Sequence, residues 1–352
     1  MGKLTSVLIG CGAIAREHLA ALERLKNVDV AAVCDLSPAR AEATAERFGI
    51  SKWYSNYREM LADIRPDLVH VTTPPSSHFA IVKDSLSANL NVLCEKPITT
   101  NYQEFDLLRR LALENGCVLM ENHNLRFHSS IQRIDRFLKT GELGDVIDVQ
   151  VCFSLNITNP KSPYADPNSA HYGLALRGGV IGDFLTHIAY LAQIFSGPAL
   201  DVRTIWEKRT TDSVLPADEF RGIIKGQRAT AHVAFSGNAQ PEGFWVRVSG
   251  TRMYAETNLL APPRLTSRRL RGGEPALMSL LDGVVEARDV LNGTLASFWR
   301  KLGGVSRYDG LSELIATTYR ALQNCEPQPI ALDEIDGVAR LVDRFTKMEL
   351  KL

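Results

Sequence analysis

Three ionisable side chains stand where they could act on a bound small molecule. Lys96 follows the apolar segment 90–94 and precedes a proline that fixes the local chain direction, so its ammonium could point at a substrate oxygen. Asp183 and His187 are four residues apart, which places them on one face of the helix expected at 179–196. A histidine beside a carboxylate can take up a proton near neutral pH, so the pair is predicted to act as a base and its partner.

Each of these residues also has a simpler interpretation. Lys96 could be an ordinary exposed lysine at a strand end. Asp183 could only stabilise the first turn of its helix, with His187 as a satisfied histidine on the same element. A metal site is a third interpretation, but no His-Glu-x-x-His pattern or further ligand accompanies the pair, so no metal is expected.

A glycine-rich turn near residue 10 predicts a binding site for a dinucleotide. The apolar segment 5–10 runs into this turn and then into a helix expected at 13–25. Gly10 permits a tight turn, Gly12 lets the backbone approach a pyrophosphate, and Ala15 lets the helix pack close to the strand. The pyrophosphate would bind the N–H groups at the start of the helix.

The acid after the second predicted strand indicates which dinucleotide binds. The segment 28–34 is typical of a buried strand and ends at Asp35, 20 residues after Ala15. A carboxylate there accepts both ribose hydroxyls and repels a 2′-phosphate, which favours NAD over NADP. Arg40 could meet such a phosphate, or it could be a solvated residue of the helix expected at 38–48.

Strand and helix patterns alternate through the first third of the chain, which predicts a parallel sheet with helices on both faces. Ligands of such sheets bind beyond the carboxyl ends of the strands. Two further strand ends carry unusual residues there, namely the runs Thr72 to His78 and Glu95 to Pro97. The expected elements are strands at 5–10, 28–34, 67–73, 90–94 and 117–121 and helices at 13–25, 38–48, 56–63, 76–88 and 101–115.

The pattern changes after about residue 125. A helix at 126–140, a strand at 146–154 and the helix at 179–196 are followed by alternating segments typical of antiparallel strands, such as 201–207, 229–235 and 243–249. We therefore expect an α/β protein with an N-terminal Rossmann domain (1–124) and a C-terminal α/β domain (125–352) that has an open, mainly antiparallel sheet flanked by helices on one side.

Bulk composition narrows the class of partner. At 352 residues the chain exceeds the usual size of one core, so two domains are expected. Lys plus Arg equals Asp plus Glu at 40 each, so overall charge predicts no nucleic-acid partner. Six scattered cysteines favour a reduced protein, and the lack of a signal-like start or of a spanning apolar run predicts a cytoplasmic protein without a membrane span.

The chain resembles the glucose-fructose oxidoreductase and inositol dehydrogenase family (Gfo/Idh/MocA) over nearly its whole length. The motifs that carry the resemblance are Gly10-Cys11-Gly12-Ala13-Ile14-Ala15, Thr73-Pro74-Pro75-Ser76-Ser77-His78, Glu95-Lys96-Pro97, Asn124-Leu125-Arg126-Phe127-His128, and Gly178-Gly179 followed by Asp183 and His187.

The resemblance implies hydride transfer between the nicotinamide of NAD and a secondary hydroxyl of a sugar, a polyol or a nucleotide-linked sugar. His187 would take the hydroxyl proton, Lys96 would polarise the oxygen, and Asp183 would orient the substrate or the histidine. The resemblance also implies a cis peptide between Lys96 and Pro97. The implied cofactor contacts are Gly10, Gly12, Ala13, Ile14, Asp35, Thr73, Pro74, His78 and Glu95, and the expected substrate contacts are Arg126, Tyr172 and Arg177.

Three places depart from the commoner form of the family. Glu121-Asn122-His123 replaces smaller residues, and Thr186 replaces a glycine before His187; both could shape substrate choice or only fill space. Residues 262–303 form an insertion that begins with arginines and continues with apolar residues at helical spacing. The arginines are Arg264, Arg268, Arg269 and Arg271, and the apolar stripe is Leu277, Leu280, Leu281, Val284, Leu291, Leu295, Phe298, Trp299 and Leu302. The stripe is expected to pack on the protein or a sister subunit, with a membrane surface as the minor alternative, and the arginines could bind a diphosphate or belong to a solvated loop.

The favoured function is a UDP-sugar 3-dehydrogenase. One alternative is an enzyme that keeps NAD tightly bound and uses transient oxidation for elimination, isomerisation or glycoside cleavage. Another is a non-catalytic sensor of NAD(H), which the presence of both Lys96 and His187 disfavours. A homo-dimer or homo-tetramer is expected, because the open sheet leaves a face to bury.

Overall fold

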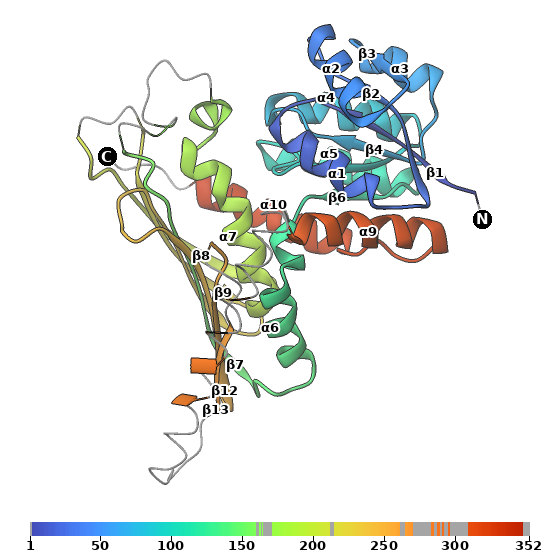
Figure 1. The fold of residues 1–352 in the computed structure, drawn as a ribbon. Coiled ribbons are helices and arrows are strands. Elements are labelled where there is room, and N and C mark those ends of the chain that lie inside the picture. The colour runs from blue at the N-terminus through green and yellow to red at the C-terminus, as the bar shows by residue number, and fades with distance from the viewer. Residues whose placement is uncertain are drawn as a thin grey trace. The chain divides into compact units, whose positions relative to one another are not determined.

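The computed structural model describes residues 2–159, 162, 164, 171–211, 215–260, 265–269, 309–347 and six helical positions between 283 and 295. These residues group into two compact units, whose elements are drawn in Figure 1. The first unit draws on residues 1–124 and 308–340, and the second on residues 125–307 and 341–352.

A six-stranded parallel sheet forms the centre of the first unit, in the order β3-β2-β1-β4-β5-β6. The order reverses between β1 and β4, and ligands of such sheets bind at this reversal. Most residues of β1 and all of β4 are buried, as expected where helices cover both faces of a parallel sheet. The strands are β1 (Leu4–Ile9), β2 (Val28–Cys34), β3 (Lys52–Tyr54), β4 (Leu68–Val71), β5 (Asn91–Cys94) and β6 (Leu119–Glu121).

The helices of the first unit include one pair that joins distant parts of the sequence. Helix α9 (Asp309–Asn324) packs against α1 (Ala13–Glu23). Because of this packing, residues 308–340 group with the first unit, although the sequence analysis assigned them to the second domain. The other helices are α2 (Pro38–Phe48), α3 (Tyr57–Asp63), α4 (Pro75–Ser87), α5 (Tyr102–Glu114) and α10 (Leu332–Lys347), which runs on into the second unit.

The second unit contains a mixed, mostly antiparallel sheet in the order β13-β12-β11-β7-β10-β9-β8. Only the β7–β10 pair of these described strands is parallel. With the parallel sheet of the first unit, this arrangement confirms the predicted fold class. The strands are β7 (Val146–Ser154), β8 (Ala199–Glu207), β9 (Glu219–Gly226), β10 (Thr230–Ser236), β11 (Gly243–Gly250), β12 (Met253–Asn258) and β13 (Leu265–Arg269).

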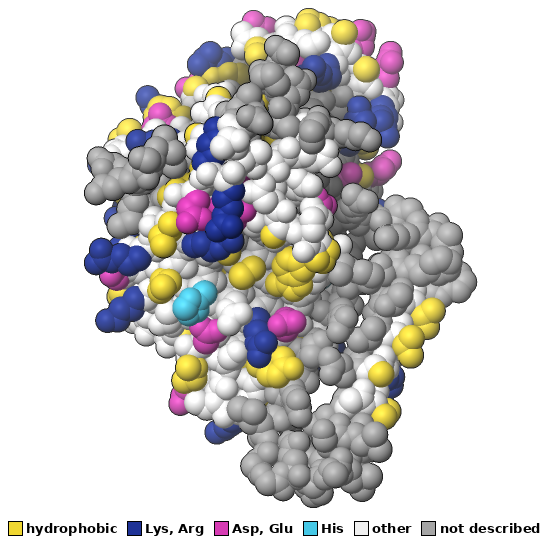
Figure 2. Space-filling view, turned by 90° about the vertical axis from the view of Figure 1, so that its left-hand side faces the viewer, with side chains coloured by type: hydrophobic (Ala, Val, Ile, Leu, Met, Phe, Trp, Pro, Cys, Tyr) yellow, Lys and Arg dark blue, Asp and Glu magenta, His cyan; other side chains and the backbone are white. Residues whose placement is uncertain are grey.

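Helices cover one face of this second sheet. Helix α7 (Val180–Ser196) packs on β7, β9 and β10, and α6 (Ser129–Lys139) contacts β12, as Figure 1 shows. The opposite face carries a mixture of basic, acidic and apolar side chains with a histidine among them (Figure 2). Strand alternation exposes Ile205, Ile223 and His232 on this sheet. The expected homo-oligomer stays a prediction.

Several elements differ from the predicted ranges. The helix predicted at 126–140 is split into a short 3-10 helix η1 (Asn124–Phe127) and α6, because His128 caps the second helix by accepting the Ser130 N–H. Strand β3 was not predicted, since its three residues are too short to show alternation. None of the helices formed by the described residues has the length and apolar character needed to cross a membrane.

Within the insertion predicted at 262–303, residues 265–269 form strand β13. Strand β13 pairs antiparallel with β12, which places Arg268 opposite Tyr254 in the sheet. Three apolar residues of the predicted stripe, Val284, Leu291 and Leu295, are helical and more than half exposed. The remaining residues of the stripe, and Arg264 and Arg271, lie outside the described residues.

Candidate active site

The turn after β1 brings Gly10 against the segment that follows β4. Gly10 has a φ of +100°, and a Cβ at this position would lie 2.7 Å from the backbone nitrogen of Thr73. Thr72 also bonds this turn, because its hydroxyl donates a hydrogen bond of 2.6 Å to the Gly10 carbonyl. Both the positive φ and the close approach require glycine at position 10.

The start of α1 has the features that a phosphate group needs. Gly12 is the N-cap residue and, having no side chain, cannot cap the helix itself. A Cβ built on Gly12 would meet none of the described atoms within 4 Å, so there is open space beside the turn. The first backbone N–H groups of the helix, at Ala13 and Ile14, therefore fit a diphosphate, while Ala15 is fully buried.

Asp35 ties this turn to the end of β2. Its Oδ2 accepts the backbone N–H of Cys11 at 2.8 Å, and its Oδ1 accepts that of Ser37 at 2.9 Å. Each oxygen retains a second lone pair that can accept a ribose hydroxyl. The guanidinium of Arg40 lies 3.7 Å from the carboxylate and its side chain is 60% exposed. These residues fit NAD at this place in the fold.

His78 connects the segments that follow β4 and β5. Its Nε2 lies 2.7 Å from the carbonyl oxygen of Thr73, and its Nδ1 lies 2.8 Å from that of Pro97. The side chain is fully buried, and burial lowers its pKa below the usual value although the two carbonyl oxygens oppose this. The structure thus shows His78 positioning these segments, with Thr73 half-buried and Pro74 exposed.

Glu95 and Lys96 lie directly after β5. Lys96 is half-buried, and the peptide between Lys96 and Pro97 is cis, as the resemblance implied. The Glu95 carboxylate is 8% exposed and bonds the His18 ring at 2.9 Å and the side-chain amide of Asn122. Burial alone would raise the pKa of Glu95, but the hydrogen bonds from His18 and Asn122, with the charge of Lys96, bring it below its usual value.

Glu121 and its neighbours hold the same segment from β6. One carboxylate oxygen of Glu121 accepts the backbone N–H of Ile98 at 2.9 Å, and the other lies 2.6 Å from Nε2 of His123. Asn122 also bonds the Cys94 carbonyl through its backbone N–H at 2.8 Å. Glu121, Asn122 and His123, which replace the smaller residues of the commoner family form, therefore hold the chain around Lys96 in position and do more than fill space.

In the second unit, Asp183 lies in the first turn of α7 and bonds Tyr172. The Tyr172 hydroxyl is 3.2 Å from both carboxylate oxygens. Asp183 is 4% exposed, whereas Tyr172, in the 3-10 helix η2 (Tyr172–Ala175), is 37% exposed. The hydroxyl of this half-exposed tyrosine is thus polarised by a buried carboxylate.

His187 lies one turn further along α7 and bonds Tyr190. Its Nδ1 is 2.8 Å from the Tyr190 hydroxyl oxygen, which also accepts the backbone N–H of Leu125 at 3.1 Å. His187 is half-buried, and Tyr190 is 1% exposed. When Nδ1–H donates to the phenol oxygen, Nε2 keeps its lone pair and can accept a proton.

Close packing surrounds the start of α7. Gly178 has a φ of +78°, and a Cβ there would lie 2.6 Å from the Trp206 ring. At Gly182 a Cβ would lie 2.3 Å from the Arg177 carbonyl oxygen. Thr186 is 1% exposed, and its hydroxyl bonds none of the described residues, so this residue fills space inside the unit.

Of the three expected substrate contacts, Tyr172 bonds Asp183. Arg126 is half-buried in η1, and Arg177 is exposed just before the two glycines that precede α7. Contact of these arginines with a substrate stays a prediction.

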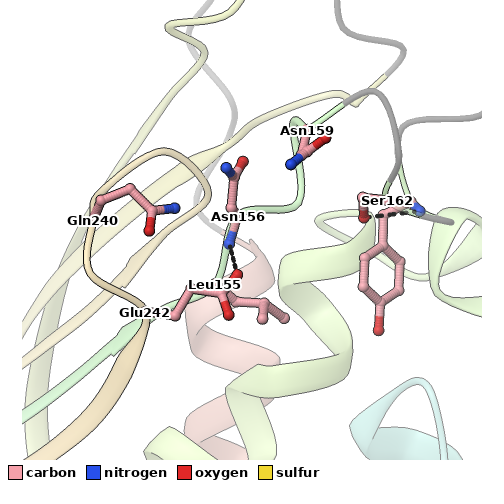
Figure 3. Close-up of a pocket in the computed structure, with 7 residues that line it drawn as sticks. Leu155, Asn156, Asn159, Ser162, Gln240 and Glu242 are labelled. Atoms are coloured by element: carbon pink, nitrogen blue, oxygen red, sulfur yellow. Dashed lines mark hydrogen bonds between the residues drawn. The ribbon is translucent and has the colours of Figure 1, made fainter.

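An open cavity of about 510 Å³ lies near these residues in the second unit. Figure 3 shows its lining, in which Glu242 accepts the Asn156 backbone N–H at 3.0 Å. Tyr164 in this lining packs edge-on against His171, which stacks on Tyr172 at 4.7 Å. An aromatic chain thus links the cavity to Asp183. The lining residues are Leu155, Asn156, Asn159, Ser162, Tyr164, Gln240 and Glu242.

Two partners of the ionisable groups, Tyr190 and His18, were not predicted from the sequence. Tyr190 could have been found, because it is three residues from His187 and shares its helix face. His18 stands on the same helix face as Ala15 and Leu19, which helical periodicity also indicates. Among the described residues no three His, Cys, Asp or Glu side chains are arranged to hold a metal ion.

Comparison with protein families gives two matches along the chain. Residues 4–123 match an oxidoreductase family with an NAD-binding Rossmann fold, GFO/IDH/MocA, and residues 131–256 match the GFO/IDH/MocA C-terminal domain. The first match includes the glycine turn and Lys96, and the second includes Asp183 and His187.

Individual relatives act on sugars according to their names. D-apiose dehydrogenase of Rhizobium rhizogenes is 29% identical over 145 residues, which are 41% of this chain and 42% of that protein. The chain thus matches about two fifths of that relative's length. The dTDP-3,4-didehydro-2,6-dideoxy-alpha-D-glucose 3-reductase of Streptomyces violaceoruber is 29% identical over 221 residues, 62% of this chain and 60% of that protein.

A solved structure shares the fold over almost the whole chain. The WlbA dehydrogenase of Bordetella pertussis, in complex with NADH and UDP-GlcNAcA, matches 98% of this chain and 94% of its own with a TM-score of 0.78. Its sequence identity is 16%, so this likeness concerns the fold.

Proposed function

Because this chain belongs to the GFO/IDH/MocA family of oxidoreductases, whose first domain is an NAD-binding Rossmann fold, we propose that it is an NAD-dependent dehydrogenase of sugar hydroxyls. The substrate is a sugar, a polyol or a nucleotide-linked sugar, and a UDP-sugar oxidised at C3 is favoured. The names of relatives support this choice, since one is a 3-reductase of a dTDP-linked sugar and the WlbA dehydrogenase was solved with a UDP-sugar.

The Asp183–His187 pair with its two tyrosines is the observation that carries the proposal. His187 takes the proton of the substrate hydroxyl on Nε2, while Tyr190 holds the ring through Nδ1. NAD, when bound, accepts the hydride from the carbinol carbon. The products are then a ketone, NADH and a protonated His187, so atoms and charge balance.

Lys96 and Asp183 have supporting roles in this reaction. The Lys96 ammonium stabilises the alkoxide character that develops on the substrate oxygen as its proton leaves. Asp183 holds the Tyr172 hydroxyl at 3.2 Å, and that hydroxyl orients the sugar by hydrogen bonding. Of the two, Lys96 therefore lowers the barrier directly and Asp183 sets the position of the substrate.

The cavity of Figure 3 suits the sugar part of such a substrate. The described residues that line it offer amide groups, hydroxyls, one carboxylate and an aromatic ring. These groups match the neutral donors and acceptors of a polyol, and the ring of Tyr164 suits an apolar sugar face. Asn156→Ala is expected to raise the KM for the sugar more than it lowers kcat.

The first experiment is NADH formation from NAD across free sugars, inositols, sugar acids and UDP-sugars. Lys96→Ala and His187→Ala are assayed beside the unmutated chain. Lys139→Ala, at an exposed position of α6, is the matched control. Turnover of a UDP-sugar that both site variants lose and the control keeps would support the favoured substrate.

Two outcomes would contradict the proposal. Turnover that survives both site variants would remove Lys96 and His187 from the chemistry. Absence of turnover with every substrate, while NAD still binds, would favour a tightly bound cofactor or a sensor.

A further inference from the structure

Four buried side chains of the first unit form one line of hydrogen bonds. Tyr319 of α9 bonds Nε2 of His70 in β4 at 2.9 Å, and Nδ1 of His70 lies 2.9 Å from Nδ1 of His18 in α1. Nε2 of His18 then lies 2.9 Å from the Glu95 carboxylate. His18 and His70 are fully buried, Tyr319 is 1% exposed, and Glu95 is 8% exposed.

The donor and acceptor roles along this line are linked to one another. A carboxylate only accepts, so Nε2 of His18 carries a proton and, in a neutral ring, Nδ1 of His18 is an acceptor. Nδ1 of His70 must then carry a proton, and its Nε2 accepts from the Tyr319 hydroxyl. Each donor therefore points along the line toward Glu95, and donation to His70 satisfies the single proton of the buried phenol.

We propose that Tyr319, His70 and His18 form a positioning relay that fixes the tautomers of both histidines and so keeps Glu95 anionic beside Lys96. The relay rests on the proposed function and deepens it, because an anionic Glu95 places a negative charge beside the Lys96 ammonium that acts on the substrate oxygen. None of the three relay residues is itself assigned a contact with substrate.

The ionisation of the separate groups agrees with this direction. Burial lowers the pKa of His70 well below its usual value, so the ring stays neutral. Burial raises the pKa of Tyr319 although the hydroxyl of Ser6 opposes this, and Asp67 raises it further, so the phenol keeps the proton that it donates. The reverse direction would need an additional proton, because Glu95 would have to be protonated and Tyr319 would still hold its own.

Titratable groups of both charge signs surround Glu95, so its ionisation depends on them as well as on the relay. Asn122 donates a second hydrogen bond to the same carboxylate oxygen that His18 bonds. That oxygen thus receives two donors from different elements. The titratable and charged groups around Glu95 are His18 of α1, His78 of α4, Cys94 and Lys96 on either side of it, and Glu121 of β6.

The direct test is nitrogen NMR of the whole chain with 15N-labelled histidine. The relay predicts that His18 carries its proton only on Nε2 and His70 only on Nδ1 near neutral pH. Single histidine substitutions assign the two signals. A proton on Nδ1 of His18, or on both of its nitrogens, would overturn the proposal. The tautomers are read on the unmutated chain, and substitution of the other six histidines assigns the two signals by elimination if the His18 or His70 variant fails to fold.

A second test removes only the first hydroxyl of the relay. In Tyr319→Phe, Nε2 of His70 loses its donor, so both histidines should exchange between tautomers and the pKa of Glu95 should rise by about one unit. Carbon NMR of the labelled Glu95 carboxyl measures this shift. The matched control is Tyr57→Phe, which removes a phenol that bonds Asp84 elsewhere in the unit.

Activity gives a separate readout of the same relay. The ratio of kcat in Tyr319→Phe to that in the unmutated chain should stay near one at neutral pH and fall as the pH drops toward the raised pKa of Glu95. Unchanged histidine signals and an unchanged Glu95 pKa in Tyr319→Phe would overturn the relay. The NMR tests need no substrate, so a lack of sugar turnover would count against the proposed function alone.

Discussion

The two units hold their ionisable side chains in different ways. In the first unit, buried Glu95 and Glu121 bond imidazoles, an amide and a backbone N–H that come from α1 and from the segments after β5 and β6. In the second unit, Asp183 and His187 share one helix, and each bonds a tyrosine close to it in sequence.

We propose that this difference separates residues that stabilise the fold from residues that react. A buried carboxylate that bonds several elements fixes their positions, and its loss leaves buried donors without partners. A half-buried histidine on a single helix can gain a proton without disturbing distant parts of the chain. We therefore expect substitutions in the first set to lower stability and substitutions in the second to lower turnover.

The largest effect is expected at His187. His187→Ala removes the proposed base, so kcat should fall by about 10²- to 10⁴-fold while NAD affinity and the unfolding midpoint stay the same. NADH absorbance and urea unfolding measure these quantities. The control is His232→Ala, which removes an exposed histidine from β10. A large loss of stability in His187→Ala would contradict the distinction between the units.

Glu121 should show the opposite behaviour. Glu121→Ala leaves the buried Ile98 N–H and the His123 ring without their acceptor, so the free energy of unfolding should fall by about 1–3 kcal/mol. Glu46→Ala, at an exposed position of α2, is the matched control in urea unfolding. Equal midpoints for the two variants would show that the buried carboxylate does not stabilise the first unit.

Asp35 tests the cofactor side of the first unit. Asp35→Asn removes the negative charge that repels a 2′-phosphate, while Arg40 remains nearby as a cation. The ratio of kcat/KM for NADP to that for NAD should rise about tenfold. Arg40→Ala in the same background should reverse part of the gain. No change in the ratio would mean that another residue selects the cofactor.

Tyr190 tests whether a hydrogen bond to Nδ1 orients the proposed base, His187. Tyr190→Phe removes the hydroxyl that holds Nδ1 of His187, so kcat should fall about three- to tenfold with little change in NAD affinity. Tyr254→Phe, in β12, serves as the control. If kcat is unchanged, Tyr190 does not orient the base.

The smallest effect is expected at Thr186. Thr186→Val keeps the shape of the side chain and removes a buried hydroxyl that bonds none of the described residues. The free energy of unfolding should rise by up to about 1 kcal/mol. A lower free energy of unfolding would show that this hydroxyl has a partner in the native protein.

The sequence predicted those parts of the site that depend on local spacing. The glycine turn with Asp35, and the Asp183–His187 pair, follow from distances of a few to twenty residues along the chain. The strands at 28–34 and 146–154 and the helix at 38–48 were predicted with the bounds that the structure shows.

The sequence did not predict contacts between distant segments. The line from Tyr319 to Glu95 joins four elements, and no local pattern relates residues 18, 70, 95 and 319. The grouping of α9 with the first unit has the same cause, since it depends on packing against α1 rather than on order in the chain.

The central claim is that Lys96 and His187 serve the same chemical step, and a double-mutant cycle tests it most directly. Lys96→Met, His187→Ala and the double variant are compared by kcat/KM on the substrate that the panel identifies. Residues that act together show strongly non-additive losses, so the double variant should lose much less than the product of the two single losses. Losses that multiply would contradict the account, because they would place the two residues in independent roles.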